Sequence, residues 1–489
     1  MTLSPVAKTG VLVTFGALFA LAGLLFYVLF PNILKWQIEK RLILSEESEM
    51  YEQWKEPSLP IYLEIYLFNI TNPEDVEANI SKPIVEEVGP FSFREKRTKE
   101  NITWNENGTV SYRLVKTWYF QPDRTNGSLD DHIITVNVPM ITAAVGAHKM
   151  NNTVVNTFMS EFFHHINSTV FISKTPRELL FDGYNDTILA VMKEMFPQLV
   201  PFTKFGWFYK KNESDGNFTF NIFTGEKGIQ NYGSVDNWNG DNNITMWQTP
   251  CNQIDGSMGE MWPPFRKSRY EKLDLFIPDI CRTISLNYLS DVELEGVEAY
   301  RYIMDHTTFD NGKYDPTNRC YCINDCLPAG GLDVSMCQKG APIVMSAPHF
   351  LYGDVAYTQS VMGLKPDPQR HLFHIDLQPQ MGVPVNVGAK MQINVIIEKI
   401  EGIMQFANIT GRTYFPALWF TQSFTINEPL IKKLQMVTQD IPYYVNVASF
   451  LSICVGVVAL LCAIAFSCQV LRKKKEKKGV YKAIRVVKS

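Results

Sequence analysis

The chain has 489 residues, with 46 Lys and Arg against 50 Asp and Glu, so its formal net charge is −4. Two terminal tails, 1–10 and 472–489, hold ten of the basic residues and one acidic residue, which leaves 36 basic and 49 acidic residues for 11–471. An acidic central region offers no bulk field for a polyanion, and we therefore expect no nucleic-acid partner.

The first predicted element is an uncharged run of 20 residues, 11–30, which follows the N-terminal tail 1–10. About 20 apolar residues cross a bilayer as a helix, so we predict a transmembrane helix here. Ala20-Leu21-Ala22 has the small-x-small pattern of a signal-peptide cleavage site, but it lies in the middle of a run longer than the apolar part of a signal. We interpret the run as a retained anchor rather than a cleaved signal.

The next region, 31–446, has the features of a glycosylated exterior domain. All twelve Asn-x-Ser/Thr acceptor sites of the chain fall in it, and none falls in a tail. The acceptor residues are Asn69, Asn79, Asn101, Asn107, Asn126, Asn151, Asn167, Asn185, Asn212, Asn217, Asn243 and Asn408. This distribution predicts that 31–446 lies outside the cytosol or in an organelle lumen.

Most of 31–446 is predicted to be antiparallel β-structure in a single domain. Runs rich in aromatic and β-branched residues occupy 61–68, 109–120 and 217–223, and apolar and polar residues alternate through 390–395. Asn-Gly pairs at 107–108, 126–127 and 311–312 indicate turns between strands.

A helical insertion is predicted near 140–196. In 152–166, Val155, Phe158, Phe162 and Ile166 recur at helical spacing and predict one apolar helix face. A second helix over 187–196 is expected to end before Pro197.

Six of the nine cysteines lie within 87 residues of this region: Cys251, Cys281, Cys320, Cys322, Cys326 and Cys337. An even number outside the cytosol predicts disulfides, with 15 possible connectivities. Cys320, Cys322 and Cys326 could also form a metal-binding knuckle, but no histidine stands near them, and an oxidising compartment favours disulfides. We therefore expect no metal site.

No catalytic motif stands out. The residues 254–259, Ile-Asp-Gly-Ser-Met-Gly, are similar to a phosphate-binding turn of actin-like ATPases, a fold that two-span ecto-nucleotidases use. The sequence lacks the second glycine-rich loop that such enzymes need, and it has no His-Glu-x-x-His or Gly-x-Ser-x-Gly motif. We interpret 254–259 as a turn beside Cys251 and expect no catalytic residues and no cofactor.

The last predicted elements are a second transmembrane helix, 447–471, and a basic tail, 472–489. Nine basic residues in the tail place it in the cytoplasm by the positive-inside rule, and two spans then place the N-terminus there too. Cys454, Cys462 and Cys468 lie in the second apolar run, and Cys468, at its cytoplasmic end, is a palmitoylation candidate. Tyr481 and Ile484 have the spacing of a Tyr-x-x-apolar endocytic sorting signal.

A two-span ligand-gated channel is an alternative interpretation of this topology. The apolar runs 11–30 and 447–468, with the preceding residue 446, offer as polar groups only Thr14, Asn446, Ser449, Ser452 and Ser467, a poor lining for a pore. Small residues are better explained by close packing of helices, either within one chain or between chains of a homo-oligomer. They are Gly16, Ala20, Gly456, Ala459 and Ala463.

Several segments resemble the class B scavenger receptor family, which includes the fatty-acid translocase, the high-density-lipoprotein receptor and the type 2 lysosomal integral membrane protein. These segments are 69–75 (NITNPED), 87–95 (EVGPFSFRE), 205–209 (FGWFY), 225–233, 261–265 (MWPPF), 276–282 (FIPDICR), the cysteine cluster and 347–350 (APHF). The resemblance covers nearly the whole chain, including both apolar runs, and suggests an invertebrate member.

The resemblance implies a two-pass α-helical membrane protein whose exterior domain is an antiparallel β-barrel core with a helical cap and an apolar tunnel. It also implies the disulfides Cys251–Cys320, Cys281–Cys337 and Cys322–Cys326. The implied function is that of a scavenger receptor, not an enzyme, that binds lipoprotein-like or anionic-phospholipid particles at the cap and passes lipid through the tunnel. The implied location is the plasma membrane, with cycling to endosomes and lysosomes. The alternative within the family is a tether for a protein or apoptotic-cell ligand without lipid transfer.

The cap departs from the family pattern in its charge. Members that bind polyanionic lipoproteins carry lysines on the cap helices, whereas this chain has no Lys or Arg in 150–173. His164 and His165 lie there instead, either as solvated surface histidines or as residues that make the cap cationic on acidification. The candidate ligand-binding residues of the cap are His148, Lys149, Phe158, Phe162, Phe163, His164 and His165.

Overall fold

A computed structural model describes residues 4–322 and 326–487, and for 480–487 it describes the backbone alone. The chain forms two compact units. Residues 42–427 make up one unit, and the terminal segments 1–41 and 428–489 make up the other. Because the two terminal helical segments, Pro5–Leu42 and Glu428–Gly479, both extend beyond the predicted spans, the first unit is shorter than the predicted exterior region, 31–446.

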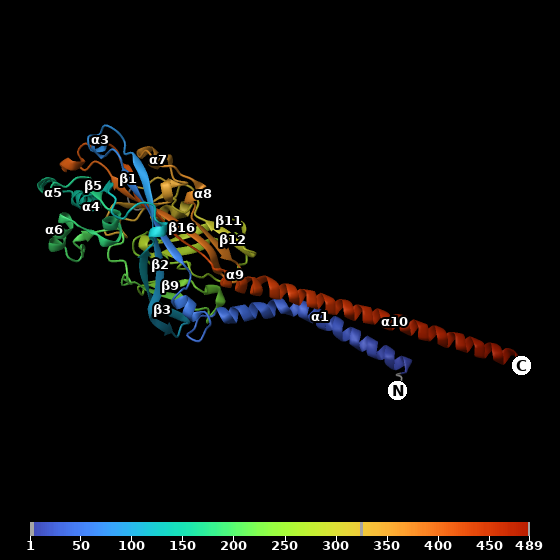
Figure 1. The fold of residues 1–489 in the computed structure, drawn as a ribbon. Coiled ribbons are helices and arrows are strands. Elements are labelled where there is room, and N and C mark those ends of the chain that lie inside the picture. The colour runs from blue at the N-terminus through green and yellow to red at the C-terminus, as the bar shows by residue number, and fades with distance from the viewer. Residues whose placement is uncertain (1–3, 323–325, 488–489) are drawn as a thin grey trace. The chain divides into compact units, whose positions relative to one another are not determined.

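The unit 42–427 is built on a large antiparallel sheet (Figure 1). Its strands follow in space in the order β10-β11-β12-β15-β16-β17-β1-β2-β3-β8-β9, and β14 pairs with β16 and β13 with β14. The bounds are β1 Ile61–Ile70, β2 Val85–Asn105, β3 Thr109–Phe120, β8 Thr219–Phe223, β9 Val235–Trp238, β10 Leu273–Ile277, β11 Arg282–Leu294, β12 Val297–Ile303, β13 Gly331–Asp333, β14 Ile343–Ser346, β15 His374–Gln378, β16 Val383–Ile397 and β17 Thr413–Thr425. The four predicted strands fall on β1, β3, β8 and β16, which confirms the β-rich assignment.

The two edges of this sheet, β9 and β10, are joined through the turn at Gly256 and Ser257. Val235 N donates to Gly256 O at 2.8 Å, and Phe276 N donates to Ser257 O at 2.9 Å. The turn 254–259 is therefore a structural element that nearly closes the sheet into a barrel, as the resemblance implied. Gly256 has φ +79°, and a Cβ there would clash with the carbonyl oxygen of Asp274, so the turn requires glycine.

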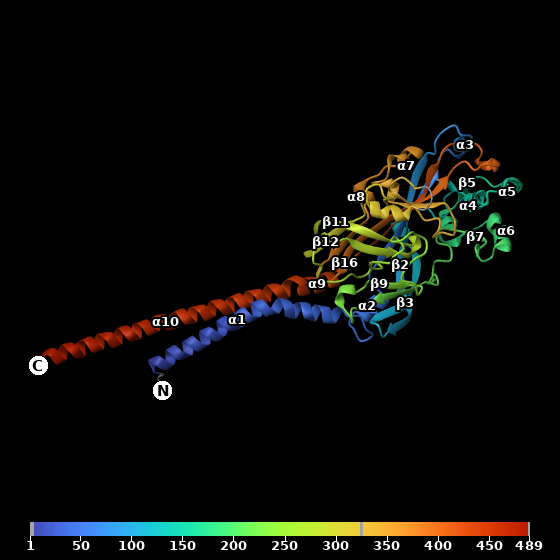
Figure 2. The same ribbon diagram turned by 180° about the vertical axis from the view of Figure 1, so that it is seen from behind.

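The helical insertion lies between β4 (Ile133–Val136) and β7 (Lys204–Phe205). It contains α4 (Val138–Lys149), α5 (Thr153–His165) and α6 (Thr187–Met195), which gather at one end of the unit in both views (Figures 1 and 2). Side chains of Asn137, Asn152 and Asp186 accept hydrogen bonds from the first-turn amides of α4, α5 and α6, as N-caps do. The helices predicted over 152–166 and 187–196 are confirmed. We call α4, α5 and α6 the cap.

Shorter elements complete this unit: α2 Tyr51–Lys55, α3 Pro73–Glu77, β5 Phe171–Lys174, β6 Tyr184–Asn185, η6 Pro348–Phe350, α7 Val355–Ser360, α8 Pro368–His371 and η7 Met404–Phe406. Strand β5 pairs with β4, and β6 pairs with β7.

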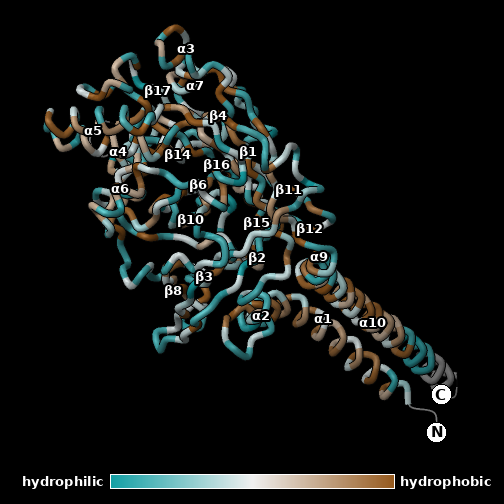
Figure 3. Tube along the Cα trace, turned by 60° about the vertical axis from the view of Figure 1, so that its left-hand side comes forward, coloured by the Kyte–Doolittle hydropathy of each residue, from teal (hydrophilic) through white to brown (hydrophobic). Residues whose placement is uncertain are grey.

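The other unit contains α1 (Pro5–Leu42), α9 (Glu428–Gln435) and α10 (Ile441–Val487). Two helices, Pro5–Leu42 and Glu428–Gly479, are long and apolar enough to cross a membrane, and each contains one of the predicted spans. Figure 3 shows their largely hydrophobic course and the hydrophilic end of α10. The chain is thus a two-span membrane protein with a β-rich domain between its spans.

One face of β2 changes from aromatic to charged along the strand. Phe91 and Phe93 are buried in an apolar cluster with residues of β1 and β17. Because side chains alternate along a strand, Glu95, Arg97 and Lys99 point to the same face. Lys99 Nζ lies 2.8 Å from a carboxylate oxygen of Glu260, in the segment that follows the closing turn. We infer that this face of β2 is the inner face of the barrel.

Candidate functional site

The cap presents an exposed apolar surface on α5. Val154 and Phe158, one turn apart on the helix, are 74% and 63% exposed. The opposite side of α5 is buried and includes Met159 and Phe163, which is fully buried. Of the residues predicted to share one apolar face, Val155 and Phe162 pack partly against the core and Phe158 faces solvent.

Phe163 differs from the other candidate residues of the cap because its ring lies in the core. It packs in the same cluster as Ile141 of α4 and Phe406 of η7. It is therefore not available to a ligand at the surface. His148, Lys149, His164 and His165 are all exposed.

Polar contacts hold α5 in place from a distant segment. Asn156 Nδ2 donates to Glu401 O at 3.0 Å, and Met404 N donates to Ser160 Oγ at 3.0 Å. Both side chains are buried, so these bonds are shielded from water. Helix α5 therefore presents Val154 and Phe158 from a firmly attached base.

The apolar surface continues on α6 and the residues that follow it. Val191, Met195, Phe196, Leu199 and Phe202 are all exposed. Monomeric domains rarely expose so many large apolar side chains in one region, and such surfaces mark binding sites. The sequence predicted the helix over 187–196 but not the exposed apolar surface that it carries.

A small apolar cleft lies beside α3. Its lining consists of Val76, Glu77, Pro83, Phe171, Ile397, Ile409 and Thr413. Phe171, Ile397 and Ile409 belong to the core cluster that holds α5. Burial raises the pKa of Glu77, the carboxyl group of this lining. The cleft thus adds an apolar recess next to the core of the cap.

The glycan acceptor asparagines are placed where glycans can be attached. Eleven of the twelve are exposed, and Asn69 is half-buried, with its Oδ1 accepting a hydrogen bond from Ile134 N at 2.8 Å. Asn151 and Asn167 lie directly before and after the cap helix α5. Glycans there would border the exposed face of α5 without starting from it.

The structure contains the disulfides Cys251–Cys320, Cys281–Cys337 and Cys322–Cys326, the same three pairs that the resemblance implies. All six cysteines of the cluster 251–337, for which disulfides were predicted, are thereby paired. Cys454, Cys462 and Cys468 are free on α10. Tyr481 and Ile484 lie outside the residues whose side chains the structure describes.

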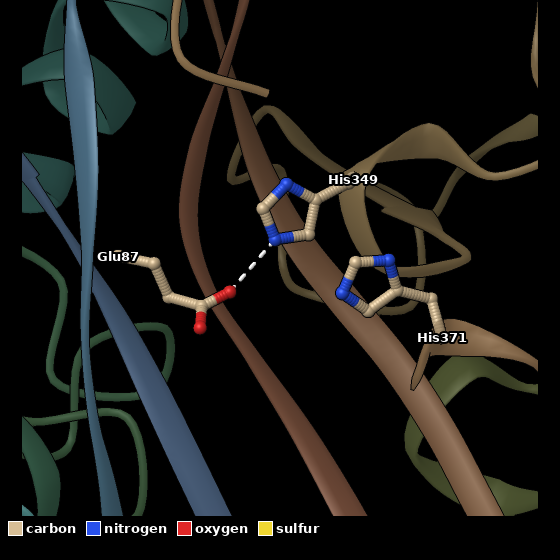
Figure 4. Close-up of side chains that lie close together, drawn as sticks. All are labelled: Glu87, His349 and His371. Carbon is tan, nitrogen blue, oxygen red and sulfur yellow. Dashed lines mark hydrogen bonds and ion pairs between the residues drawn. The ribbon is translucent and has the colours of Figure 1, made fainter. Parts of the chain in front are cut away.

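A buried polar cluster that the sequence did not indicate joins Glu87, His349 and His371 (Figure 4). Glu87 Oε2 accepts hydrogen bonds from His349 Nε2 and Trp419 Nε1, both at 2.8 Å, and Glu87 Oε1 accepts one from Arg370. Burial alone would raise the pKa of Glu87, but these three hydrogen bonds lower it to about 2.

The ligand atoms of Glu87, His349 and His371 lie within 4.8 Å of one another, as in a metal site, but their protonation does not fit one. His349 Nδ1 accepts a hydrogen bond from Lys365 N, and His371 Nδ1 accepts one from Asp367 N, both at 3.0 Å. Each neutral ring must therefore carry its proton on Nε2, the nitrogen that would have to bind the metal. We interpret Glu87 as a carboxylate held by hydrogen bonds from His349, Trp419 and Arg370, with the His371 ring stacked on that of His349.

Comparison with known proteins places this fold in a family. A family model described as "CD36 family" matches residues 14–467. Scavenger receptor class B member 1 of Bos taurus is 33% identical over 455 residues, which cover 92% of this chain and 87% of the relative. Protein peste of Drosophila melanogaster is 34% identical over 408 residues, which cover 81% of this chain and 72% of the relative. Lysosome membrane protein 2 of Rattus norvegicus is 31% identical over 429 residues, which cover 85% of this chain and 87% of the relative.

Proposed function

The chain belongs to the CD36 family, and we propose that it is a scavenger receptor that binds lipid-bearing particles at its cap. The observation that carries this proposal is the exposed apolar surface formed by Val154 and Phe158 on α5 and continued on α6. Contact with a lipid surface removes such side chains from water, which is worth about 25 cal/mol per Å² of apolar area. A relative named scavenger receptor class B member 1 supports the receptor role.

We further propose that lipid passes from the cap through the barrel to the membrane. Each exposed CH₂ of an acyl chain costs about 0.8 kcal/mol, so a walled apolar path lowers the barrier without any catalysis. Phe91 and Phe93 on the inner face of β2 support such a path. The ion pair of Lys99 with Glu260 makes the far part of this face polar, and the proposed path therefore follows the aromatic part.

The charge of the cap suggests how ligand binding depends on pH. With no Lys or Arg in 150–173, the α5 surface is apolar at neutral pH. His164 and His165 are both exposed in the last turn of α5, and histidine is the side-chain type that serves as a charge switch in acidic compartments. We propose that anionic particles bind more tightly as the pH falls toward that of endosomes.

We propose that the protein resides at the plasma membrane and cycles to endosomes and lysosomes. Two candidate spans and a basic tail support a cytoplasmic location for both termini. Tyr481-x-x-Ile484 in that tail is the proposed endocytic signal, and Cys468 is the proposed palmitoylation site. A relative named lysosome membrane protein 2 supports an endolysosomal destination.

Lipid extraction and mass spectrometry of the purified, glycosylated protein test the proposed function. A receptor that conducts lipid should retain a defined lipid class in its interior. An interior without lipid, together with a tightly bound protein ligand, would contradict lipid transfer. It would favour the alternative of a tether for a protein or apoptotic-cell ligand. Current recorded from expressing cells would instead favour the channel.

A further inference from the structure

The segment that connects β14 to β15, residues 347–372, lies against β2 and β17, and we call it the strap. Backbone hydrogen bonds hold its middle: Val85 N donates to Met362 O at 3.0 Å, and Met362 N donates to Pro83 O at 2.8 Å. Towards each end, a buried histidine holds it, His349 near the start and His371 near the finish.

The strap's own backbone fixes both histidines in one protonation state. Lys365 N and Asp367 N donate to the Nδ1 atoms of His349 and His371, so each neutral ring carries its proton on Nε2. A second proton can bind only at Nδ1, where it would face a backbone N–H group. Each ring can therefore be protonated only if a hydrogen bond of the strap is broken.

The surroundings of His371 also oppose a positive charge. The ring is 1% exposed and stacks on His349 with 4.4 Å between ring centroids. Among the described residues, none accepts a hydrogen bond from its Nε2. The titratable groups around the ring are Glu87 on β2, Tyr66 on β1, His349 in η6, Asp367 before α8 and Arg370 on α8. Burial, then His349 and Arg370, lower the pKa of His371 to about 4.

The backbone of the strap is held in an unfavourable conformation next to this cluster. His349, Phe350 and Tyr352 have φ values of 52°, 56° and 62°, in the left-handed region that side chains with a Cβ rarely adopt. His349 N donates to Gln392 Oε1 of β16, which helps to hold this conformation. Release of the strap would relieve the strain.

We propose that the strap is a latch that opens on acidification, leaving β2 and β17 and uncovering the aromatic surface of Phe68 and Trp419. Both side chains are 1% exposed while the strap is closed. The proposed latch does not rest on ligand binding by the cap or on lipid transfer. Its residue Val361, however, packs with Phe68 and Trp419 in the core cluster that also contains residues of α4 and α5.

The direction of the effect follows from proton linkage. His371 has a lower pKa in the closed state than its ordinary 6.5, so the open state binds more protons. The closed state therefore loses stability as the pH falls from about 6.5 to about 4. Between pH 7.4 and pH 5.0, the open-to-closed ratio should rise about 25-fold. Glu87, with its pKa of about 2, stays ionised across this range and does not add to the change.

Hydrogen–deuterium exchange of the full-length protein in detergent at pH 7.4 and pH 5.0 tests the latch, with labelling times scaled to the intrinsic exchange rate. Peptides from 347–372 should lose protection about 25-fold at pH 5.0, relative to reference peptides from 282–303. In His371→Asn, the amide oxygen can replace Nδ1 as acceptor for Asp367 N, and the side chain cannot be protonated, so the response should disappear. His306→Asn, at an exposed histidine outside the strap, should respond as the wild type does.

Equal protection of 347–372 at both pH values in the wild type would overturn the proposal. An equal loss of protection in 282–303 at pH 5.0 would also overturn it, because it would indicate global unfolding. So would a loss of protection in 347–372 of His371→Asn as large as that of the wild type. If His371→Asn does not fold, the wild-type comparison of 347–372 with 282–303 decides the question by itself.

Discussion

Gly16 of α1 and Gly456 of α10 lie so close together that neither has room for a side chain. A Cβ on Gly456 would lie 2.6 Å from the carbonyl oxygen of Gly16, and one on Gly16 would lie 2.8 Å from that of Gly456. Buried small residues repeat every seven positions along both helices, at Gly16 and Gly23 and at Ser449, Gly456 and Ala463. This repeat keeps them in one seam, and the small residues predicted to pack helices do so within one chain.

Gly456→Leu should therefore destabilise the helix pair, by about 1–3 kcal/mol, the usual cost of overpacking. Gly10→Leu is the matched control, because no described atom lies within 4 Å of a Cβ at that position. Thermal melting in detergent should show a lower midpoint for Gly456→Leu than for the control. Equal melting midpoints for the two variants would mean that the small-residue seam contributes little to the stability of the helix pair.

The closure of the barrel gives a second prediction. Gly256→Ala and Gly240→Ala place alanine at similar φ values, +79° and +88°, so both should pay about 1–2 kcal/mol for the left-handed conformation. Only the Cβ at Gly256 meets the carbonyl oxygen of Asp274, whereas no described atom lies near that of Gly240. The free energy of unfolding, measured in urea, should therefore fall by about 1–3 kcal/mol more in Gly256→Ala than in Gly240→Ala. Similar losses in both variants would show that the turn at 256 does not hold the sheet edges together.

The disulfides should differ in their contribution to stability. Cys251–Cys320 joins residues 69 positions apart, whereas Cys322–Cys326 spans four. Loop entropy predicts that replacing both cysteines of the first pair with serine lowers the free energy of unfolding by about 4 kcal/mol. The same replacement in the second pair should lower it by about 2 kcal/mol. Melting midpoints of the two variants under non-reducing conditions test this order, and the reverse order would contradict it.

Glu87 should make the protein sensitive to strong acid. Its lowered pKa contributes stability above its ordinary value of 4.5, and this stability is lost as the pH falls from 4.5 toward 2. The expected loss between pH 5.5 and pH 3 is about 2 kcal/mol. Glu87→Gln cannot ionise and should lack this part of the acid dependence in urea titrations at the two pH values. If the free energy of unfolding of Glu87→Gln falls between pH 5.5 and pH 3 by as much as that of the wild type, Glu87 is not the source of the acid dependence.

The sequence predicted the elements of the cap better than their orientation. Helical spacing identified α5, but it scored only apolar residues, and the buried face includes Asn156 and Ser160. These polar side chains are buried because they bond to the backbone near Glu401 and Met404, about 245 positions away. Local periodicity carries no information about such a partner and therefore does not show which side of α5 faces the core.

The polar cluster was not predictable for a related reason. Glu87 and His349 are 262 positions apart, and each stood in a different motif of the resemblance. The antiparallel sheet brings β2 and β17 to the strap, and only that arrangement places a carboxylate beside two histidines. The disulfide pairs were likewise open among 15 connectivities until the resemblance was used.

The most direct test of the proposed receptor function is the affinity of the protein for liposomes of neutral phospholipid at pH 7.4, compared between Phe158→Ser and Leu289→Ser. Both positions are exposed, at 63% and 52%, but Leu289 lies on β11, outside the cap. Removing the Phe158 ring should weaken binding roughly tenfold or more, since a buried aromatic side chain contributes about 1.5–3 kcal/mol. Leu289→Ser should bind as the wild type does. Equal affinity of Phe158→Ser and wild type would contradict a lipid-binding cap.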